Sequence, residues 1–266
     1  MAVDNLAEDA GALYQKILCK HTKMLLRRVI FTQKEDLVNK DIFPEIGKDG
    51  RTKGDINVSP AVIKRLPRYF RYLRELIREG TLRISSSELS ERMHVTASQI
   101  RQDLNCFGGF GQQGYGYNVQ YLYTKISELL GVGEGFCAIL IGAGNLGKAL
   151  VNNPMFEKRG VDVIAAFDVS PDVVGARLGN LTVLDMKELE AFCSRHAVDM
   201  AVLTMPKQAT PDVVQRLSSL GIKAFWNFTG AEPENLCKGV TVENVHLGDS
   251  LMTLCYRLRC ADEEEV

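Results

Sequence analysis

The sequence lacks any apolar run long enough to cross a bilayer, and its seven cysteines contain no C-x-x-C pair. The first absence argues against a membrane protein. Acidic residues near the N-terminus (Asp4, Glu8, Asp9), where a signal peptide would be basic, favour a cytoplasmic protein. The second absence argues against a disulfide framework or a zinc site, so no metal is expected. Cys137 and Cys255 lie within apolar runs and are predicted to be small, reduced packing residues.

Net charge is also nearly absent, at −1 for 266 residues, but the charge is unevenly distributed. Residues 58–120 contain nine Lys and Arg against five Asp and Glu, a balance of +4, whereas residues 121–266 contain thirteen against nineteen, a balance of −6. The first region is therefore the one suited to a polyanion such as nucleic acid. An apolar content of 45% over this length is sufficient for two domains.

A glycine-rich turn stands between an apolar strand, residues 136–141, and a predicted helix, residues 145–158. Such a turn brings backbone N–H groups and a helix N-terminus to a dinucleotide pyrophosphate. A second strand, residues 161–167, ends at Asp168, whose carboxylate would bind the adenosine ribose hydroxyls and repel a 2′-phosphate, so NAD is favoured over NADP. A glycine turn without a ligand is the alternative. The candidate cofactor residues of the turn are Gly142, Ala143, Gly144, Asn145, Leu146 and Gly147.

Strands and helices alternate from residue 121 to residue 246, which predicts a parallel sheet covered by helices on both faces, a Rossmann domain. The helices are expected at 121–130, 187–196 and 209–220, and the later strands at 181–184, 199–204, 223–228 and 240–245. Ligands bind such sheets at the carboxyl ends of the strands. Loop residues there are further cofactor candidates, although ordinary loop chemistry would also explain them: Thr204, Met205, Pro206, Asn227 and Thr229.

Residues 58–120 predict three short helices followed by a hairpin. Serine and threonine are placed to cap the second and third helices, and Leu89, Met93, Val95, Ile100 and Leu104 are expected in a small core. The third helix then leaves a polar fringe for a DNA major groove, formed by Ser98, Gln99, Arg101, Gln102 and Asn105. A generic three-helix interaction module would show the same pattern.

Alternating glycines and aromatics follow the third helix, in residues 108–117. They favour a hairpin wing that lies close to a DNA backbone or reaches the minor groove. The alternative is a flexible linker, but the segment has more aromatic residues than a solvated spacer needs. Gln112, Gln113 and Tyr115 are candidate DNA contacts in this wing, and Tyr117 is a candidate aromatic wall for the nicotinamide.

The two ends of the chain are interpreted separately. Residues 1–57 show no clear fold signal and are taken as an N-terminal extension, or as sequence upstream of the native start. Residues 247–260 predict a C-terminal helix with an apolar stripe that includes Leu251, Leu254 and Leu258. The stripe could dock on its own domain or on a second subunit. The acidic residues of 261–266 are expected to be a solvated tail.

The motifs together resemble the Rex family of redox-sensing transcriptional repressors over residues 59 to 258. The resemblance is carried by Arg65-Leu-Pro-Arg-Tyr69, Gln99-Ile-Arg-Gln-Asp-Leu104, Phe107-Gly-Gly-Phe-Gly111, Gly116-Tyr-Asn118 and Ile141-Gly-Ala-Gly-Asn-Leu-Gly147. It implies a winged-helix DNA-binding domain before the Rossmann domain, with Arg65 and Arg68 among the DNA contacts. It also implies a homodimer that exchanges its C-terminal helices, binds a palindromic operator, senses the NADH/NAD⁺ ratio and leaves DNA when NADH binds.

Some positions differ from the family pattern. Gln102, Gln112 and Gln113 stand where many relatives have basic residues, so phosphate attraction should be weaker and less salt-dependent. His246 stands where many relatives have an aspartate, which leaves a pH-dependent role or an uninvolved surface histidine as the two interpretations.

Two other functions are weighed against the repressor. An NAD-dependent dehydrogenase needs an acid or base beside the nicotinamide, and His246 is the one histidine expected near it. A nucleotide-binding scaffold without DNA affinity is less consistent with the arginines of the first region, Arg68, Arg71, Arg74 and Arg101. The chain is therefore expected to be a repressor and not an enzyme.

Overall fold

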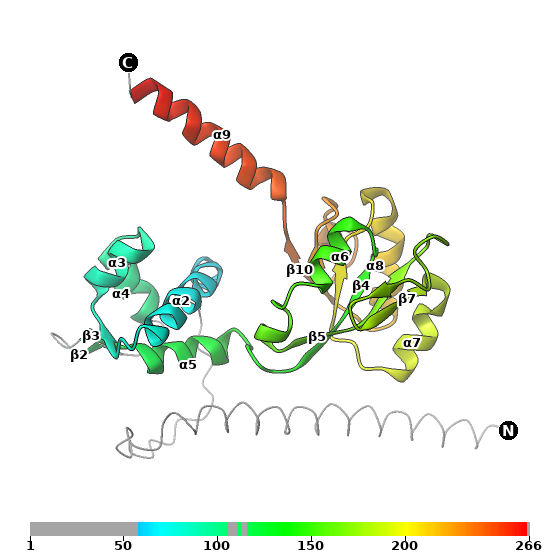
Figure 1. The fold of residues 1–266 in the computed structure, drawn as a ribbon, viewed down its shortest axis with the longest axis horizontal. Coiled ribbons are helices and arrows are strands. Elements are labelled where there is room, and N and C mark those ends of the chain that lie inside the picture. Colours follow the sequence, from blue (N-terminus) through cyan, green and yellow to red (C-terminus); the bar gives the residue numbers. More distant parts are fainter. Residues whose placement is uncertain (1–57, 106–110, 113–115, 265–266) are drawn as a thin grey trace, which may run out of the picture. The chain divides into compact units, whose positions relative to one another are not determined.

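The computed structural model describes residues 58–105, 111–112 and 116–264 of the chain. These residues form two compact units that divide between Val132 and Gly133 (Figure 1). Each unit has its own hydrophobic core. The predicted N-terminal extension, residues 1–57, and the wing residues Gln113 and Tyr115 lie outside the described ranges.

The first unit, named the winged-helix unit, combines short helices with a small antiparallel sheet. The strand order is β1-β3-β2, and Tyr117 of the central strand is paired with Ile84 on one side and Gly111 on the other. Helices α3 and α4 precede the β2–β3 hairpin, so the predicted winged helix is confirmed. The elements are α2 (Pro60–Arg78), β1 (Arg83–Ile84), α3 (Ser86–Met93), α4 (Ala97–Asn105), β2 (Gly111–Gln112), β3 (Gly116–Asn118) and α5 (Val119–Leu129).

Short polar side chains begin the helices of this unit. Ser85 and Glu88 form a reciprocal capping box at α3, with N···O distances of 3.1 Å and 2.7 Å. Ser59 accepts a hydrogen bond from the N–H of Val62 at α2, and Thr96 accepts one from the N–H of Gln99 at α4. Each bond satisfies an N–H that has no partner within the helix, which fixes where the helix begins.

The core of the winged-helix unit is built by α2, α3, α4 and α5. The predicted core residues Leu89, Met93, Ile100 and Leu104 are buried, and Val95 packs against them partly buried. Helix α5 contributes further buried residues, Leu122 and Ile126, to the same core. The expected domain boundary at residue 120 therefore falls too early, because the apolar face of α5 packs on α2 and the unit continues to Val132.

The second unit, named the dinucleotide unit, contains a seven-stranded sheet of order β10-β9-β8-β4-β5-β7-β6 in its described residues. All neighbouring strands are parallel except β6, which pairs antiparallel with β7. The predicted Rossmann topology is confirmed. Its elements are β4 (Phe136–Ile141), α6 (Asn145–Val151), β5 (Val161–Asp168), β6 (Arg177–Leu178), β7 (Leu181–Asp185), α7 (Leu189–Arg195), β8 (Met200–Leu203), α8 (Thr210–Ser219), β9 (Ala224–Asn227), β10 (Thr241–Asn244) and α9 (Leu247–Glu264).

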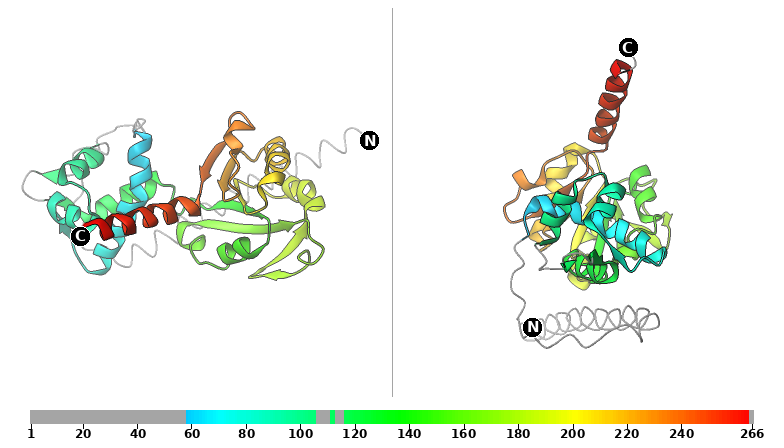
Figure 2. Two further views of the ribbon diagram at one scale, coloured as in Figure 1. Left: turned by 90° about the horizontal axis from the view of Figure 1, so that it is seen from above. Right: turned by 90° about the vertical axis from the view of Figure 1, so that its left-hand side faces the viewer.

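Helices cover both faces of this sheet, as the two views of Figure 2 show. Side chains alternate along β4, so Ala138 and Leu140 enter the core on the α6 side, while Ile139 and Ile141 enter the core formed with α7 and α8. An aromatic cluster lies on the α6 side. There the ring of Trp226 packs edge-on against Phe156 and Phe228, with centroids 5.7 Å and 4.7 Å apart.

Helix α6 is shorter than the sequence suggests. The predicted helix 145–158 ends at Val151, and a separate 3₁₀ turn spans Glu157–Arg159. Pro154 explains the break, because proline has no N–H to donate and disfavours a helical residue before it. The chain then reverses at Gly160, whose φ of +69° suits glycine, and enters β5.

The last helix, α9, presents large apolar side chains to solvent. Leu251, Leu254 and Leu258, the leucines of the predicted stripe, are 62%, 53% and 60% exposed. Leu247 at the start of the helix is 64% exposed. Such a surface is unfavourable in water unless another surface covers it. In the part of the chain that the structure describes, no helix has the length and apolarity to cross a membrane.

Candidate functional site

The glycine turn after β4 has the geometry that a dinucleotide needs. Gly142 has a φ of +95° and donates its N–H to the carbonyl of Phe167 at 2.8 Å. A Cβ at Gly142 would lie 2.8 Å from the carbonyl oxygen of Thr204, so a larger residue would force the backbone to shift. A Cβ at Gly144 would meet nothing within 4 Å, which leaves space beside the backbone for a ligand group. Gly142 thus shapes the turn, whereas Gly144 leaves space for a ligand to approach the backbone.

Asp168, at the carboxyl end of β5, supports the turn from one side. One carboxylate oxygen accepts the N–H of Ala143 at 2.7 Å, and the other accepts the N–H of Ser170 at 2.9 Å. A carboxylate oxygen has more than one lone pair, so these bonds fix the orientation of Asp168 and leave acceptor capacity for hydroxyl groups. The acid is therefore held beside the glycine turn before any ligand arrives.

Thr204, at the carboxyl end of β8, supports the turn from the other side. Its hydroxyl donates to the carbonyl of Gly142 at 2.6 Å, and its N–H donates to the carbonyl of Ile141 at 2.9 Å. A Cβ at Gly147 would meet the same hydroxyl oxygen at 2.9 Å. The hydroxyl proton of Thr204 is thus used within the protein, and its contribution is to shape the turn.

A pocket of about 200 Å³ opens at the carboxyl ends of β4, β5 and β8. Six residues proposed from the sequence line it together: Gly142, Gly144, Asp168, Thr204, Met205 and Pro206. The sequence analysis missed its apolar walls, formed by Ile141, Phe167, Val169, Met186, Ala209 and Val213. The strand-end rule applied to β7 would have identified Met186, and the i, i+4 spacing of Ala209 and Val213 would have indicated one helix face.

The other predicted residues of the glycine motif line no part of this pocket. Ala143 is buried, Leu146 is half-buried and Asn145 is exposed. Gly147 is buried, and a Cβ there would meet the hydroxyl of Thr204 at 2.9 Å. Of the residues that line the pocket, Asp168 alone is titratable, so the lining offers no histidine, lysine or cysteine for proton transfer to a substrate.

Asn227 is the last residue of β9, Thr229 lies in the loop that follows, and the two side chains are hydrogen-bonded to each other. The Asn227 amide is 1% exposed and donates to the carbonyl of Ala231 at 2.8 Å and to Oδ1 of Asn244 at 2.7 Å. Its oxygen accepts the N–H and the hydroxyl of Thr229, at 3.1 Å and 2.7 Å. The hydrogen-bonding groups of the Asn227 amide thus hold the loop, and its contact with a nicotinamide stays a prediction.

Tyr117, the aromatic residue expected beside the nicotinamide, lies in β3 and is 9% exposed in the core of the winged-helix unit. Burial raises the pKa of its hydroxyl, and the nearby charge of Arg101 opposes that shift. Tyr117 is thus a core residue of its own unit. Glycine-aromatic alternation does not show which aromatics turn inward, and a contact of Tyr117 with the nicotinamide stays a prediction.

Helix α4 presents a polar surface of the kind that enters a major groove. Ser98, Arg101, Gln102 and Asn105 are exposed, and their spacing places them on one face. Arg101 donates to the hydroxyl of Ser86 at 2.9 Å, which connects α4 to the start of α3. Gln112 lies in β2, the first strand of the hairpin that follows.

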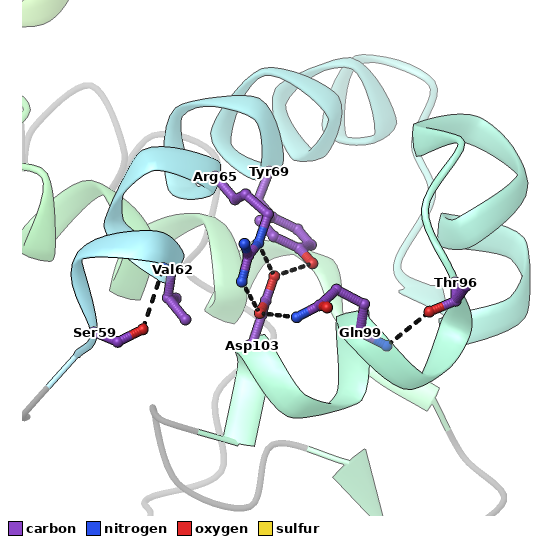
Figure 3. Close-up of polar contacts among 7 residues, drawn as sticks. All are labelled: Ser59, Val62, Arg65, Tyr69, Thr96, Gln99 and Asp103. Atoms are coloured by element: carbon purple, nitrogen blue, oxygen red, sulfur yellow. Dashed lines mark hydrogen bonds and ion pairs between the residues drawn. The ribbon is translucent and has the colours of Figure 1, made fainter.

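Two of the predicted DNA contacts, Arg65 and Gln99, instead converge on a buried carboxylate, Asp103 (Figure 3). Arg65 donates to both carboxylate oxygens, at 2.7 Å and 2.6 Å, and Gln99 donates its side-chain N–H at 2.7 Å. The Tyr69 hydroxyl donates at 3.0 Å. The side chain of Asp103 is fully buried and that of Arg65 is 34% exposed. These four residues are named the Asp103 cluster.

The Asp103 cluster shifts two pKa values. Burial alone would raise the pKa of Asp103, but hydrogen bonds from Arg65, Gln99 and Tyr69 and the charge of Arg65 outweigh it and hold that pKa below its ordinary value. Burial, and then the charge and hydrogen bond of Asp103, raise the pKa of Tyr69 well above its ordinary value. The cluster is therefore an ionised carboxylate beside a neutral phenol, and it fixes α4 against α2.

Arg68, another predicted DNA contact, donates to the backbone carbonyl of Met93 and is half-buried. Met93 is the last residue of α3, so Arg68 connects α2 to α3. The described residues hold no group of three or more His, Cys, Asp or Glu side chains suited to a metal ion.

Comparison with known proteins gives matches in both units. Residues 57–105 match the family described as "Putative DNA-binding protein N-terminus", and residues 137–231 match the family described as "CoA binding domain". The redox-sensing transcriptional repressor Rex of Thermoanaerobacter sp. (strain X514) is 50% identical over 209 residues, which cover 79% of this chain and 92% of the relative. The Rex protein of Clostridioides difficile (strain 630) is 49% identical over 206 residues, covering 77% of this chain and 98% of the relative.

Two solved structures of a repressor called RSP are also similar. The structure of RSP in complex with NADH has a TM-score of 0.72 and 45% identity, and covers 79% of this chain and 98% of RSP. The structure of RSP in complex with NAD⁺ and operator DNA has a TM-score of 0.71 and 48% identity, and covers 78% of this chain and 95% of RSP.

Proposed function

The chain belongs to the Rex family of redox-sensing transcriptional repressors, and from this premise we propose how its two units divide the function. It is a DNA-binding repressor that senses NADH and NAD⁺, and it is not an enzyme. The observation that carries the proposal is the pocket at the glycine turn, present in the same chain as the exposed polar face of α4. A repressor of this kind acts where the bacterial chromosome is, which is the cytoplasm.

The cofactor is bound at the carboxyl ends of β4, β5 and β8. The open space beside Gly144 admits the pyrophosphate, and Asp168 accepts hydrogen bonds from the ribose hydroxyls. The negative charge of Asp168 disfavours a 2′-phosphate, so NAD(H) is preferred over NADP(H). Thr204 keeps the turn in this shape through its bond to the Gly142 carbonyl.

Discrimination between the two redox forms follows from charge. The nicotinamide ring of NAD⁺ is cationic and that of NADH is neutral, so an apolar environment costs the oxidised form more desolvation free energy. Phe228, half-buried beside Trp226 at the end of β9, provides an apolar surface near the strand ends. We place the nicotinamide on this side of the loop after β9.

Operator DNA is bound by α4 in the major groove, with the hairpin at the backbone or the minor groove. Arg101 and Gln102 are the side chains expected to contact the bases or phosphates. Asp103 is not itself a DNA contact, because it is fully buried. Its role is to hold α4 and the side chains of Arg65 and Gln99 in place.

A homodimer is the assembly that accounts for α9. Four leucines of α9 are exposed among the residues that the structure describes, and exchange of α9 between two copies would bury them. A two-fold dimer presents two α4 helices to a palindromic operator, with half-sites about one DNA turn apart. NADH then releases DNA if it favours a dimer arrangement in which the two α4 helices no longer match the half-sites.

The test is the affinity of the full chain for an AT-rich palindromic duplex, measured by surface plasmon resonance with NADH or NAD⁺ at one salt concentration. We expect saturating NADH to weaken binding at least tenfold, equivalent to about 1.4 kcal/mol of coupling, at concentrations where NAD⁺ has little effect. A duplex with a scrambled sequence serves as the control. Equal affinity with and without NADH would contradict the proposed function.

A further inference from the structure

The loop after β9 is fixed to the end of β10 by a continuous hydrogen-bond network. The Asn227 amide makes four hydrogen bonds inside the protein, two as donor and two as acceptor. The two donated bonds use both N–H groups of the amide, and Asn227 is 1% exposed. A displacement of Thr229 or Ala231 would therefore leave a buried polar group without a partner unless Asn227 and its other partners moved as well.

Asn244, the last residue of β10, continues the network to a second point. Its Oδ1 accepts from Asn227 at 2.7 Å, and its Nδ2 donates to Oε1 of Glu234 at 2.8 Å. The next residue, Val245, donates its N–H to the backbone carbonyl of Asn227 at 2.8 Å. Asn244 thus joins both ends of the loop, residues 227 and 234, to the strand that leads into α9.

Helix α9 begins at Leu247, so a short connection separates Asn244 from the helix with the uncovered leucines. A small displacement at the end of β10 changes the direction in which a helix of 18 residues leaves the sheet. The loop after β9 lies at the carboxyl edge of the sheet, where the proposed function places the nicotinamide end of the cofactor. The network therefore joins the loop at the proposed nicotinamide end to Asn244 and Val245, which precede α9 by only a short connection.

We propose that Asn244 is a positioning residue that couples the loop after β9 to the start of α9, and so transmits cofactor binding to the arrangement of two copies. This rests on the proposed function, because it assigns a route for NADH-dependent release of DNA. Asn244 itself touches neither cofactor nor DNA in this scheme. A simple loop brace would share the same hydrogen bonds, but its loss would change stability without changing the coupling.

The experiment compares Asn244→Ala with a matched control, Glu234→Gln, in the full chain. Asn244→Ala removes the acceptor for Asn227 and the donor to Glu234, whereas Glu234→Gln keeps an amide oxygen to accept from Asn244. The readout is the ratio of affinities for the AT-rich palindromic duplex without and with saturating NADH. We expect this affinity ratio to be at least about tenfold in the wild type and in Glu234→Gln. In Asn244→Ala we expect the ratio to fall below about threefold.

The affinity of Asn244→Ala for NADH alone and for the duplex alone is expected to stay within about twofold of wild type. A wild-type ratio in Asn244→Ala would overturn the proposal, and so would a loss of NADH binding, which would make Asn244 a binding residue. If Asn244→Ala does not fold, Asn244→Asp still accepts from Asn227 but cannot donate to Glu234, and it is expected to lower the ratio as well. Failure of NADH to release wild-type protein would instead contradict the proposed function.

Discussion

In the winged-helix unit a buried charge positions the functional helix, whereas in the dinucleotide unit backbone geometry positions the pocket. Asp103 draws Arg65, Gln99 and Tyr69 together and fixes α4 against α2. The pocket depends instead on the left-handed conformation of Gly142 and on the ends of packed strands. The position of α4 is therefore sensitive to changes of charge and pH, whereas the shape of the pocket is sensitive to side-chain volume added at the glycine turn.

The difference indicates how each unit can be changed without damage to the other. A buried ion pair is costly to break on one side, because the remaining charge has no partner. A glycine turn is costly to fill, because the backbone cannot move away from an added methyl group. Substitutions of the two types should therefore separate DNA binding from cofactor binding within one chain.

The largest effect is expected from Asp103→Leu. It leaves the Arg65 guanidinium without its carboxylate and should reduce the unfolding free energy of the winged-helix unit by about 3 kcal/mol. Urea denaturation followed by circular dichroism measures the loss, and isothermal calorimetry should show that NADH still binds. The double variant Arg65→Met/Asp103→Leu should recover part of the stability, because both partners are absent. A double variant as unstable as the sum of the single variants would show that the pair is not coupled.

A smaller effect on stability is expected from Gly142→Ala in the dinucleotide unit. A Cβ 2.8 Å from the Thr204 carbonyl, at a φ of +95°, should cost about 2 kcal/mol of unfolding free energy. Gly144→Ala is the matched control, because its Cβ meets no atom within 4 Å. It should leave the melting temperature nearly unchanged but reduce NADH affinity by at least about tenfold, if the pyrophosphate approaches there. Full NADH affinity in Gly144→Ala would place the pyrophosphate elsewhere.

The smallest effect is a change in stability with pH. The depressed pKa of Asp103 gives stability that is present above the unfolded value, about 3.9, and is lost as pH falls through the folded pKa. The raised pKa of Tyr69 gives stability that is present below about pH 10 and is lost as pH rises above it. Thermal melting of the winged-helix unit should therefore decline at both extremes. Asp103→Asn should reduce the loss of melting temperature at acid pH. An unchanged loss in this variant would show that other groups cause it.

The sequence predicted best those features that depend on neighbouring residues. The strand, the turn and the start of the helix around Gly142 follow from glycine conformation and apolar runs, and a serine caps α3 as the sequence predicted. Asp168 could be placed at the end of β5 because the length of the βαβ unit is nearly constant. These are local rules, and the structure agrees with them.

The sequence predicted poorly which polar side chains would be engaged inside the protein. Arg65 and Asp103 are 38 positions apart, and no periodicity pairs them. Asn227 was assigned to a ligand because it lies at the carboxyl end of a strand, although its partner Asn244 lies 17 positions later. In both cases the internal partner was missed for one reason: a polar residue near a site looks the same in sequence whether it faces a ligand or a buried partner.

The single tryptophan of the chain, Trp226, lies between Phe156 and Phe228 in the dinucleotide unit. Its emission therefore reports on one unit alone, and the winged-helix unit contributes no tryptophan signal. Reduced nicotinamide absorbs light in the range where tryptophan emits, and oxidised nicotinamide does not. A bound NADH near the end of β9 would quench Trp226 by energy transfer, while a bound NAD⁺ would not. The intrinsic fluorescence of the protein therefore distinguishes the two redox forms of the bound cofactor.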